Sequence, residues 1–314
     1  MSKFIIKQAG IPAYLEELIS KNYHLVDITK DESSINKDVY KEAEILVTNG
    51  ETFVDLNTIN KFPALKLIAN FGVGYDRIDV NAAIKKGILV SNTPDVLTED
   101  VADLAVGLLL SLSRAIPRAD NFVKQGLWEK NGMGSFPWTY KVSGSSVGIV
   151  GMGRIGKAIA KRMAAFDVKV GYYSHKPIDQ YIHYDSLEKL AVDSDFLIVA
   201  VPGVAANYHL INDKVIDALG PEGSLINIAR GNVVDEKYLT QALIDAKIRG
   251  AALDVFENEP FVGAKLRSLN NVVLTPHMAS ATYQTREAMC KLVFDNIEHF
   301  HLDGKLLTPI PECK

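Results

Sequence analysis

An apolar run followed by three closely spaced glycines is the feature that most constrains the fold of this chain. Val147-Gly148-Ile149-Val150 has the composition of a buried strand, and Gly151-Met152-Gly153-Arg154-Ile155-Gly156 follows it directly. A helical pattern then extends over residues 154–165. A strand, a G-x-G-x-x-G turn and a helix in this order form the dinucleotide-binding unit of doubly wound α/β folds. The motif therefore predicts a parallel sheet that binds the pyrophosphate of a dinucleotide.

Each position of this glycine turn has an expected physical role. Gly151 permits the tight turn, Gly153 lets the backbone approach the pyrophosphate, and Gly156 lets the helix pack closely on the strand. The backbone amides at the helix N-terminus, including those of Arg154 and Ile155, are expected to face the phosphates. A loop with three packing glycines and no ligand is the alternative, which the flanking strand and helix disfavour.

Strand-like and helical patterns alternate along the chain, which is typical of parallel α/β architecture. In a first small unit we expect strands at 4–7, 24–28, 45–48, 65–69 and 88–91, and a helix over 79–86 that Gly87 ends. In a second unit we expect six strands, at 147–150, 168–173, 196–201, 225–229, 251–255 and 272–275. A long helix over 100–113, with Thr98 as its N-cap, marks the crossing between the units.

Two further segments complete this organisation. Residues 121–145 are rich in Gly, Pro and Trp, which predicts an irregular arm rather than a packed element. Phe136 and Trp138 in this arm either contribute to a neighbouring subunit's site or pack within the arm, and the sequence leaves both open. A C-terminal helix with a single apolar stripe is expected to return to the first unit, and its stripe consists of Met289, Leu292, Val293, Ile297 and Phe300.

Composition and charge narrow the functional class. The length of 314 residues favours two domains, and 34 basic against 38 acidic residues give a net charge of −4. Because the chain has no dense Lys/Arg block, nucleic acid is not an expected partner. It has neither a signal-peptide pattern nor a long apolar run, so we expect a cytoplasmic protein with no membrane partner. Cys290 and Cys313 make a poor disulfide framework or metal site, and no metal is expected.

The end of the second strand of the cofactor unit predicts which dinucleotide binds. NAD-selective sites place an acid there, which accepts a hydrogen bond from the ribose 2′-hydroxyl. This chain has Ser174 at that position, followed by His175 and Lys176. A hydroxyl and two cations can bind a 2′-phosphate that a carboxylate would repel. NADP(H) is therefore the preferred cofactor and NAD(H) is possible, while the alternative is that residues 175 and 176 are only solvated turn residues.

Three polar residues follow three successive strands of the same unit. Arg230 comes after 225–229, Glu259 lies beyond 251–255, and His277 follows 272–275. The carboxyl ends of parallel strands lie at one edge of a sheet, where the nicotinamide must arrive. Each residue alone is more often structural or solvated. Reduction of a 2-keto acid requires a cation that binds its carboxylate and carbonyl, and an acid that protonates the oxygen. Arg230 suits the first role and His277 the second, with Glu259 as the partner of His277.

Other contacts are expected near this edge. Asp254 is placed to accept a hydrogen bond from the nicotinamide carboxamide, with helix capping as the alternative. In the first unit the amides of Val73 and Gly74 are expected to bind the substrate carboxylate, with a plain tight turn as the alternative. Arg230 and His277 are expected to contact both cofactor and substrate. The remaining cofactor contacts are expected at Val201, Pro202, Ile228, Ala229 and Ser280.

Several motifs make the chain resemble the D-2-hydroxyacid dehydrogenases over its whole length. The motifs are Asn70-Phe71-Gly72-Val73-Gly74, Asn92-Thr93-Pro94-Asp95, the glycine turn, Asn227-Ile228-Ala229-Arg230-Gly231, Leu253-Asp254-Val255-Phe256 with Glu259-Pro260, and Thr275-Pro276-His277. The resemblance implies a Rossmann-type cofactor domain of residues 99–282 inserted in a smaller flavodoxin-like substrate domain of residues 1–98 and 283–314. It also implies a cleft between them, a homodimer built on the cofactor domains, and catalytic positions at Arg230, Glu259 and His277.

Within that family, residues 93–103 and the Tyr-Tyr-Ser strand end are most similar to NADPH-dependent glyoxylate and hydroxypyruvate reductases, including the plant hydroxyphenylpyruvate type. This implies reduction of a small 2-keto acid to the D-2-hydroxy acid. His175 stands where that subgroup usually carries arginine, which implies weaker and pH-dependent selectivity for the phosphate. The alternatives are a hydroxyphenylpyruvate or other D-2-hydroxyacid dehydrogenase that uses NADH, and a non-enzymatic NAD(P)-sensing protein like the corepressors that share this fold.

Overall fold

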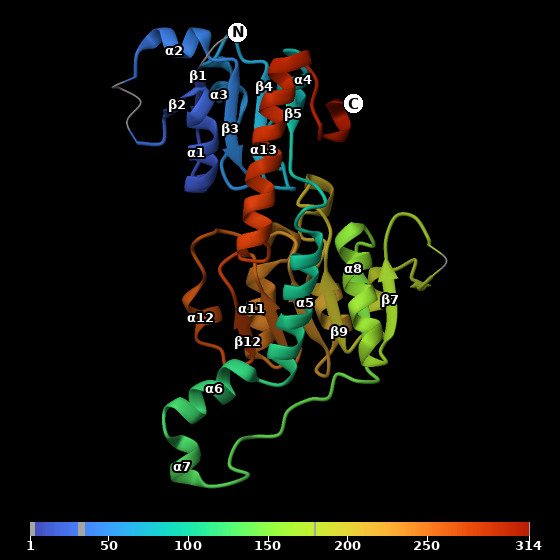
Figure 1. Cartoon of the computed structure of the whole chain (residues 1–314). Helices are drawn as coiled ribbons and strands as arrows, with labels where there is room; N and C mark the ends of the chain where they lie inside the picture. The colour runs from blue at the N-terminus through green and yellow to red at the C-terminus, as the bar shows by residue number, and fades with distance from the viewer. Residues whose placement is uncertain (1–3, 31–34, 179, 314) are drawn as a thin grey trace. The chain divides into compact units, whose positions relative to one another are not determined.

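The structure is a computed structural model that describes residues 4–30, 35–178 and 180–313 (Figure 1). The chain divides into two compact units, one of Met1–Leu97 with Ser280–Lys314 and one of Thr98–Ala279. The boundaries expected after residues 98 and 282 differ from these by one and three residues. Each unit has its own parallel sheet with helices on both faces, so each is a complete α/β layer structure.

The sheet of the first unit has the strand order of flavodoxin-like folds. In the described residues the order is β2-β1-β3-β4-β5, with every pairing parallel. The strands are β1 (Phe4–Lys7), β2 (His24–Asp27), β3 (Ile45–Asn49), β4 (Leu67–Phe71) and β5 (Leu89–Ser91). The expected start of β4 at residue 65 is wrong by two residues, because Leu65 is buried in the preceding turn, where its N–H donates to the Phe62 carbonyl.

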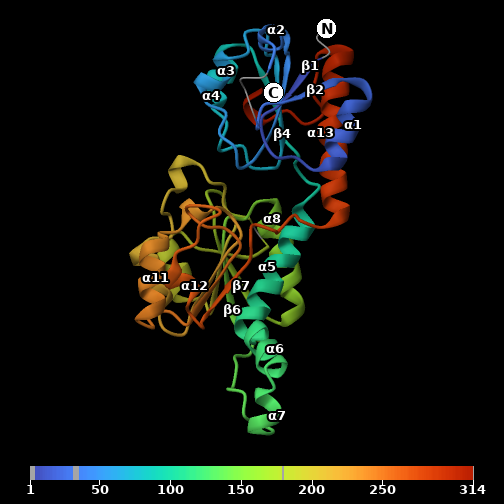
Figure 2. The same cartoon turned by 90° about the vertical axis from the view of Figure 1, so that its left-hand side faces the viewer.

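Helices cover both faces of this first sheet (Figures 1 and 2). One face carries α1 (Ala13–Asn22) and α13 (Tyr283–Asp303), and the other carries α2 (Lys37–Glu42), α3 (Leu56–Asn60) and α4 (Val80–Lys85). The helix expected over 79–86 is α4, with Asp79 as its N-cap and Gly87 just beyond its end. The apolar stripe of α13 packs toward β4 and α1, so this C-terminal helix belongs to the first unit, as its periodicity predicted.

The sheet of the second unit is doubly wound. In the described residues its order is β12-β11-β10-β9-β6-β7-β8, and all pairings are parallel. The strands are β6 (Ser146–Val150), β7 (Lys169–Tyr173), β8 (Ile182–His183), β9 (Phe196–Val199), β10 (Ser224–Asn227), β11 (Gly250–Leu253) and β12 (Val272–Leu274). Counted from β6, this is the dinucleotide-fold order 3-2-1-4-5-6 with one strand added at the end. The expectation of six strands missed β8, which is too short to leave an apolar run.

The helices of the second unit also form two layers (Figure 2). α5 (Thr98–Ser113) and α8 (Arg154–Met163) pack together on one face, while α9 (Leu187–Val192), α10 (Asp213–Leu219) and α11 (Glu236–Ile244) lie on the other. Short segments complete the list: α12 (Ala264–Arg267), η2 (Ala164–Phe166), η3 (Ala205–Asn207), η4 (Gly231–Val233) and, in the first unit, η5 (Pro311–Cys313). The expectation that Thr98 caps α5 is wrong, because the preceding turn winds directly into the helix and Thr98 is its first residue.

The segment expected to be an irregular arm contains two helices. α6 (Ile116–Lys124) and α7 (Leu127–Asn131) follow α5 and are separated by Gly126 in the left-handed conformation. The prediction for residues 121–145 is therefore wrong for the first part of the segment, although 132–145 is without helix or strand. Neither helix buries a residue within the described chain, so the amphipathic pattern of α6 does not mark a core-facing element, and α7 is only five residues long.

The described residues lack a metal-binding cluster and a membrane-spanning helix. They contain no group of three or more His, Cys, Asp or Glu side chains placed to hold a metal ion. None of their helices combines the length and the apolar character needed to cross a membrane.

Candidate active site

The glycine turn between β6 and α8 has the geometry that close approach of a ligand requires. Gly151 has a φ of 97°, and a Cβ at this position would lie 2.8 Å from the Ala200 carbonyl oxygen. A Cβ on Gly156 would lie 2.1 Å from the Gly151 carbonyl oxygen, so the turn and α8 can touch only because residue 156 is glycine. A Cβ on Gly153 would meet nothing within 4 Å. This open space at a helix N-terminus fits the pyrophosphate of a dinucleotide.

The segment after β7 presents hydroxyl and cationic groups rather than an acid. Ser174 is half-buried, and its carbonyl oxygen lies 3.1 Å from Nε2 of His183 on β8. His175 and Lys176 are exposed to solvent. An exposed lysine and an exposed imidazole beside a serine hydroxyl suit a phosphate group better than an acid at this position would.

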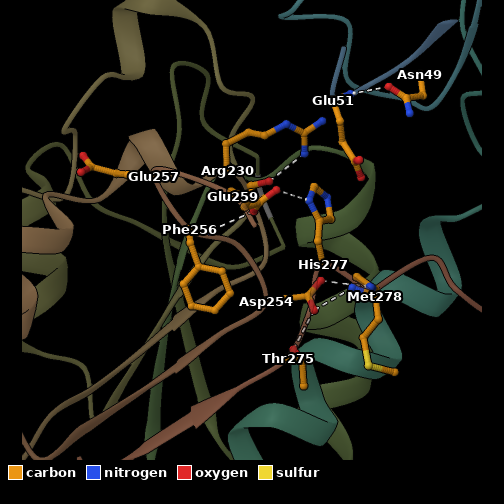
Figure 3. A network of polar contacts seen from close by, with 12 residues as sticks. Asn49, Glu51, Arg230, Asp254, Phe256, Glu257, Glu259, Thr275, His277 and Met278 are labelled. Carbon is orange, nitrogen blue, oxygen red and sulfur yellow. Dashed lines mark hydrogen bonds and ion pairs between the residues drawn. The ribbon is translucent and has the colours of Figure 1, made fainter. Parts of the chain in front are cut away.

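His277 and Glu259 form a hydrogen-bonded pair (Figure 3). Oε2 of Glu259 lies 2.8 Å from Nδ1 of His277, and Oε1 accepts from the Phe256 N–H at 2.9 Å. Burial raises the pKa of Glu259, but the hydrogen bond and charge of His277 outweigh this effect and the pKa lies below its usual value. The carboxylate is therefore ionised at neutral pH. It holds the imidazole through Nδ1, which leaves Nε2 as the nitrogen available to a substrate.

Asp254 fixes the turn that carries His277. It is fully buried, and its Oδ1 accepts from the Thr275 hydroxyl at 2.6 Å and the Met278 N–H at 2.9 Å, while Oδ2 accepts from the Ala279 N–H at 3.0 Å (Figure 3). His277 has a φ of 48°, and its N–H donates to the Asp254 carbonyl. These bonds hold a backbone conformation that non-glycine residues rarely adopt. The alternative of helix capping is wrong, and the nicotinamide contact stays a prediction.

Arg230 lies at the turn after β10. Its Nη1 donates to the Ala229 carbonyl at 2.8 Å, and its positive charge helps to lower the pKa of Glu259. Asn227 fixes the turn, since its Nδ2 donates to the Arg230 carbonyl at 3.1 Å and its Oδ1 accepts from the Ala229 N–H at 3.0 Å. The stem of Arg230 passes Gly203, where a Cβ would lie 2.6 Å from its Cγ. The fold therefore brings Arg230, Glu259 and His277 together within one unit.

Gly231 lets two loops of the site pack closely, a role that the sequence motif at 227–231 did not indicate. A Cβ there would lie 1.9 Å from the carbonyl carbon of Phe256 and 2.3 Å from the backbone nitrogen of Glu257. The loop after β11, which carries Glu259, thus crosses directly over the turn after β10. The sequence carries a weak signal for this crossing, namely a glycine directly after the strand-end arginine. Asn227 and Gly203, which lie near the same turn, are further signals of this kind.

In the first unit, two buried asparagines fix the loop that follows β4. Nδ2 of Asn70 donates to the carbonyls of Gly72 and Gly74 at 3.0 Å each, and Nδ2 of Asn92 donates to the Val73 carbonyl at 2.9 Å. In a trans peptide the N–H points away from the preceding carbonyl, so the amides of Val73 and Gly74 face away from these asparagines. These bonds fix the loop, while its contact with a substrate carboxylate stays a prediction and the tight turn stays the alternative.

The remaining predicted positions lie where the strand ends place them. Val201 and Pro202 follow β9, Ile228 and Ala229 follow β10, and their cofactor contacts stay predictions. Ser280 begins the C-terminal segment of the first unit, whereas the other predicted cofactor residues belong to the second unit, and its cofactor contact stays a prediction.

The two aromatic residues of the arm differ in their environments. Phe136 packs edge-on against Phe122 at 5.5 Å between ring centroids, whereas Trp138 is 99% exposed. Packing within the arm thus accounts for Phe136 and not for Trp138.

Comparison with known proteins identifies relatives that match nearly the whole chain. Residues 106–279 match the family model described as D-isomer specific 2-hydroxyacid dehydrogenase, NAD binding domain. The chain is 45% identical over 311 residues to glyoxylate/hydroxypyruvate reductase A of Arabidopsis thaliana, with 98% of each covered. It is 43% identical over 311 residues to hydroxyphenylpyruvate reductase of Plectranthus scutellarioides, again with 98% of each covered.

A solved structure extends the likeness to the fold. The NADPH-dependent glyoxylate/hydroxypyruvate reductase from Sinorhizobium meliloti, in complex with NADP and malonate, matches with a TM-score of 0.94 and 41% identity over 99% of this chain and 97% of that one. The predicted fold class and the predicted enzyme class, an NAD(P)-dependent oxidoreductase, are thereby confirmed. The chain belongs to the D-isomer specific 2-hydroxyacid dehydrogenase family.

Proposed function

We propose that the protein reduces glyoxylate, hydroxypyruvate or a similar small 2-keto acid to the D-2-hydroxy acid with NADPH. The observation that carries this proposal is the His277–Glu259 hydrogen bond of 2.8 Å, with the charge of Arg230 acting on the same carboxylate. The reaction needs a proton donor and a cation for the substrate carboxylate, and these residues supply both. Relatives named for these reductases support the choice of substrate.

In the proposed mechanism the protein orients the substrate and supplies one proton. Arg230 binds the carboxylate and the carbonyl oxygen of the keto acid, and its charge stabilises the negative charge that develops on that oxygen. The glycine turn of residues 151–156 would hold the nicotinamide cofactor, which when bound would supply a hydride for the keto carbon. Nε2 of His277 donates its proton to the oxygen, while Glu259 holds the ring through Nδ1. The amides of Val73 and Gly74 are the second contact proposed for the carboxylate.

Initial rates with NADPH and NADH against glyoxylate, hydroxypyruvate, pyruvate and 4-hydroxyphenylpyruvate test the proposal. We expect the highest kcat/KM for NADPH with glyoxylate or hydroxypyruvate. A preference for 4-hydroxyphenylpyruvate would instead support the second candidate, hydroxyphenylpyruvate reduction, which the Plectranthus relative favours. If neither cofactor is oxidised with any of the four acids, the proposal fails and a nucleotide-sensing role becomes the better account.

The substitution Ser174→Asp is expected to favour NADH. A carboxylate at this strand end repels a 2′-phosphate and accepts from a 2′-hydroxyl, so the ratio of kcat/KM for NADPH to that for NADH should fall by about tenfold or more, equivalent to about 1.4 kcal/mol. The control is Ser268→Asp, which adds the same charge at an exposed position after α12. An unchanged ratio in Ser174→Asp, or an NADH preference in the unsubstituted enzyme, would show that Ser174 does not select the phosphate.

A further inference from the structure

Three glutamates surround the turn that carries the proposed acid–base pair, and only one of them belongs to that pair. Glu259 faces His277, whereas the side chain of Glu257 points away from it (Figure 3) and contacts Nε2 of His209. The third, Glu236, is the first residue of α11, and its Oε2 accepts from the Glu257 N–H at 3.0 Å. Glu236 is thus bonded to the backbone of the same turn that carries Glu259.

Glu236 differs from the two neighbouring glutamates in its ion-pair partners. Glu257 pairs with His209, whose Nδ1 lies 3.9 Å from Asp235, and Glu259 pairs with His277 and feels the charge of Arg230. Among the described residues, no cation forms an ion pair with Glu236.

The pKa of Glu236 shows that this residue and its neighbours interact. Burial raises it above its usual value, and the charges of Glu257 and Glu259 raise it further, against the opposing hydrogen bond from the Glu257 N–H. Electrostatic interaction is reciprocal, so a charge on Glu236 acts in turn on the pair that contains Glu259.

We propose that Glu236 is a positioning residue for the Glu259–His277 pair. Its carboxylate fixes the turn through the Glu257 N–H, and its negative charge favours the protonated state of the pair, from which the substrate oxygen takes its proton. This inference rests on the proposed function, because it concerns the same proton transfer. The side chain of Glu236 contributes both a hydrogen bond and a charge, and substitutions can remove these one at a time.

The substitution Glu236→Gln removes the charge and keeps an oxygen that can accept from the Glu257 N–H. We expect the basic limb of the pH profile of kcat/KM to move to lower pH by about half a unit, with the plateau value of kcat within about threefold of the original. Glu236→Ala removes the acceptor as well. We expect it to lower kcat by about tenfold while KM for NADPH changes by less than about twofold, because the turn and not the cofactor site is loosened.

Glu222→Gln is the matched control. Glu222 is exposed, pairs with Arg249 and lies just before the start of β10, so the same change of charge should leave the pH profile unchanged. Thermal denaturation of each variant gives its folded fraction, by which the rates are normalised. A Glu236→Gln profile that coincides with that of Glu222→Gln would overturn the inference, as would a rate loss in Glu236→Ala that follows the folded fraction alone.

His277→Ala, measured under the same conditions, separates this inference from the proposed function. If His277→Ala is inactive and the Glu236→Gln profile is unshifted, only the role of Glu236 fails. If His277→Ala keeps its turnover, the assignment of the proton donor fails and the proposed mechanism with it.

Discussion

Replacement of His277 by alanine is expected to lower kcat for keto-acid reduction by about two to four orders of magnitude, the range typical of a lost general acid. The reason is geometric, since Glu259 holds Nδ1 at 2.8 Å and leaves Nε2 to donate the proton. Binding of NADPH should change far less than turnover, because the glycine turn and the segment after β7 are untouched and only the predicted contact of His277 is lost. Steady-state rates and a fluorescence titration of NADPH measure the two effects separately.

Two further variants sharpen the test of His277. Glu259→Gln should lower kcat less than His277→Ala, because the ring keeps a hydrogen-bond partner at Nδ1 and loses only the negative charge beside it. His299→Ala, at an exposed position on α13, should leave the rate unchanged. A value of kcat for His277→Ala within threefold of the original enzyme would remove His277 from the mechanism.

Gly231→Ala is expected to damage both stability and turnover. A Cβ at 1.9 Å from the Phe256 carbonyl carbon cannot be accommodated unless the loop after β11 moves, and that loop carries Glu259. Overpacking against backbone typically costs about 1–3 kcal/mol in the free energy of unfolding. A shift of Glu259 away from His277 should also lower kcat by at least about tenfold. Denaturant unfolding and steady-state rates measure the two effects.

Gly263→Ala is the control for this substitution. Gly263 is exposed, has a φ of −55° and has nothing within 4 Å of a built Cβ, so stability and rate should be nearly unchanged. If Gly231→Ala behaved like Gly263→Ala, the close crossing of the two loops would not be needed for activity.

The sheets could be predicted from the sequence, and the peripheral elements could not. Parallel strands buried on both faces leave continuous apolar runs, so all the strands were expected except β8. That strand has two residues, of which Ile182 is exposed, and it therefore has no apolar signature. The helices α6 and α7 were missed for a different reason, because the glycines of residues 126–144 indicated an irregular segment and obscured the short helical patterns beside them.

The catalytic candidates could be predicted, while the contacts that support them could not. Arg230, Glu259 and His277 are recognisable because their strands end at one edge of the sheet. Gly231 and Glu236 matter through contacts with backbone that is more than twenty residues away in sequence, namely that of Phe256 and Glu257. Asp254 was expected to face the cofactor, but three donors from the turn of residues 275–279 converge on its carboxylate, and sequence alone does not reveal such a convergence.

The strand order of the second unit also bears on how coenzyme use can change over evolutionary time. Ser174, His175 and Lys176 follow β7, on one side of the switch point between β6 and β9, whereas the three residues proposed for chemistry follow the strands on the other side. Selection acting on the nucleotide pool of a cell can therefore alter the first group stepwise while proton transfer and substrate binding are conserved. If Ser174 selects the phosphate as proposed, a lineage with this topology can exchange one coenzyme for the other while it keeps its catalytic residues.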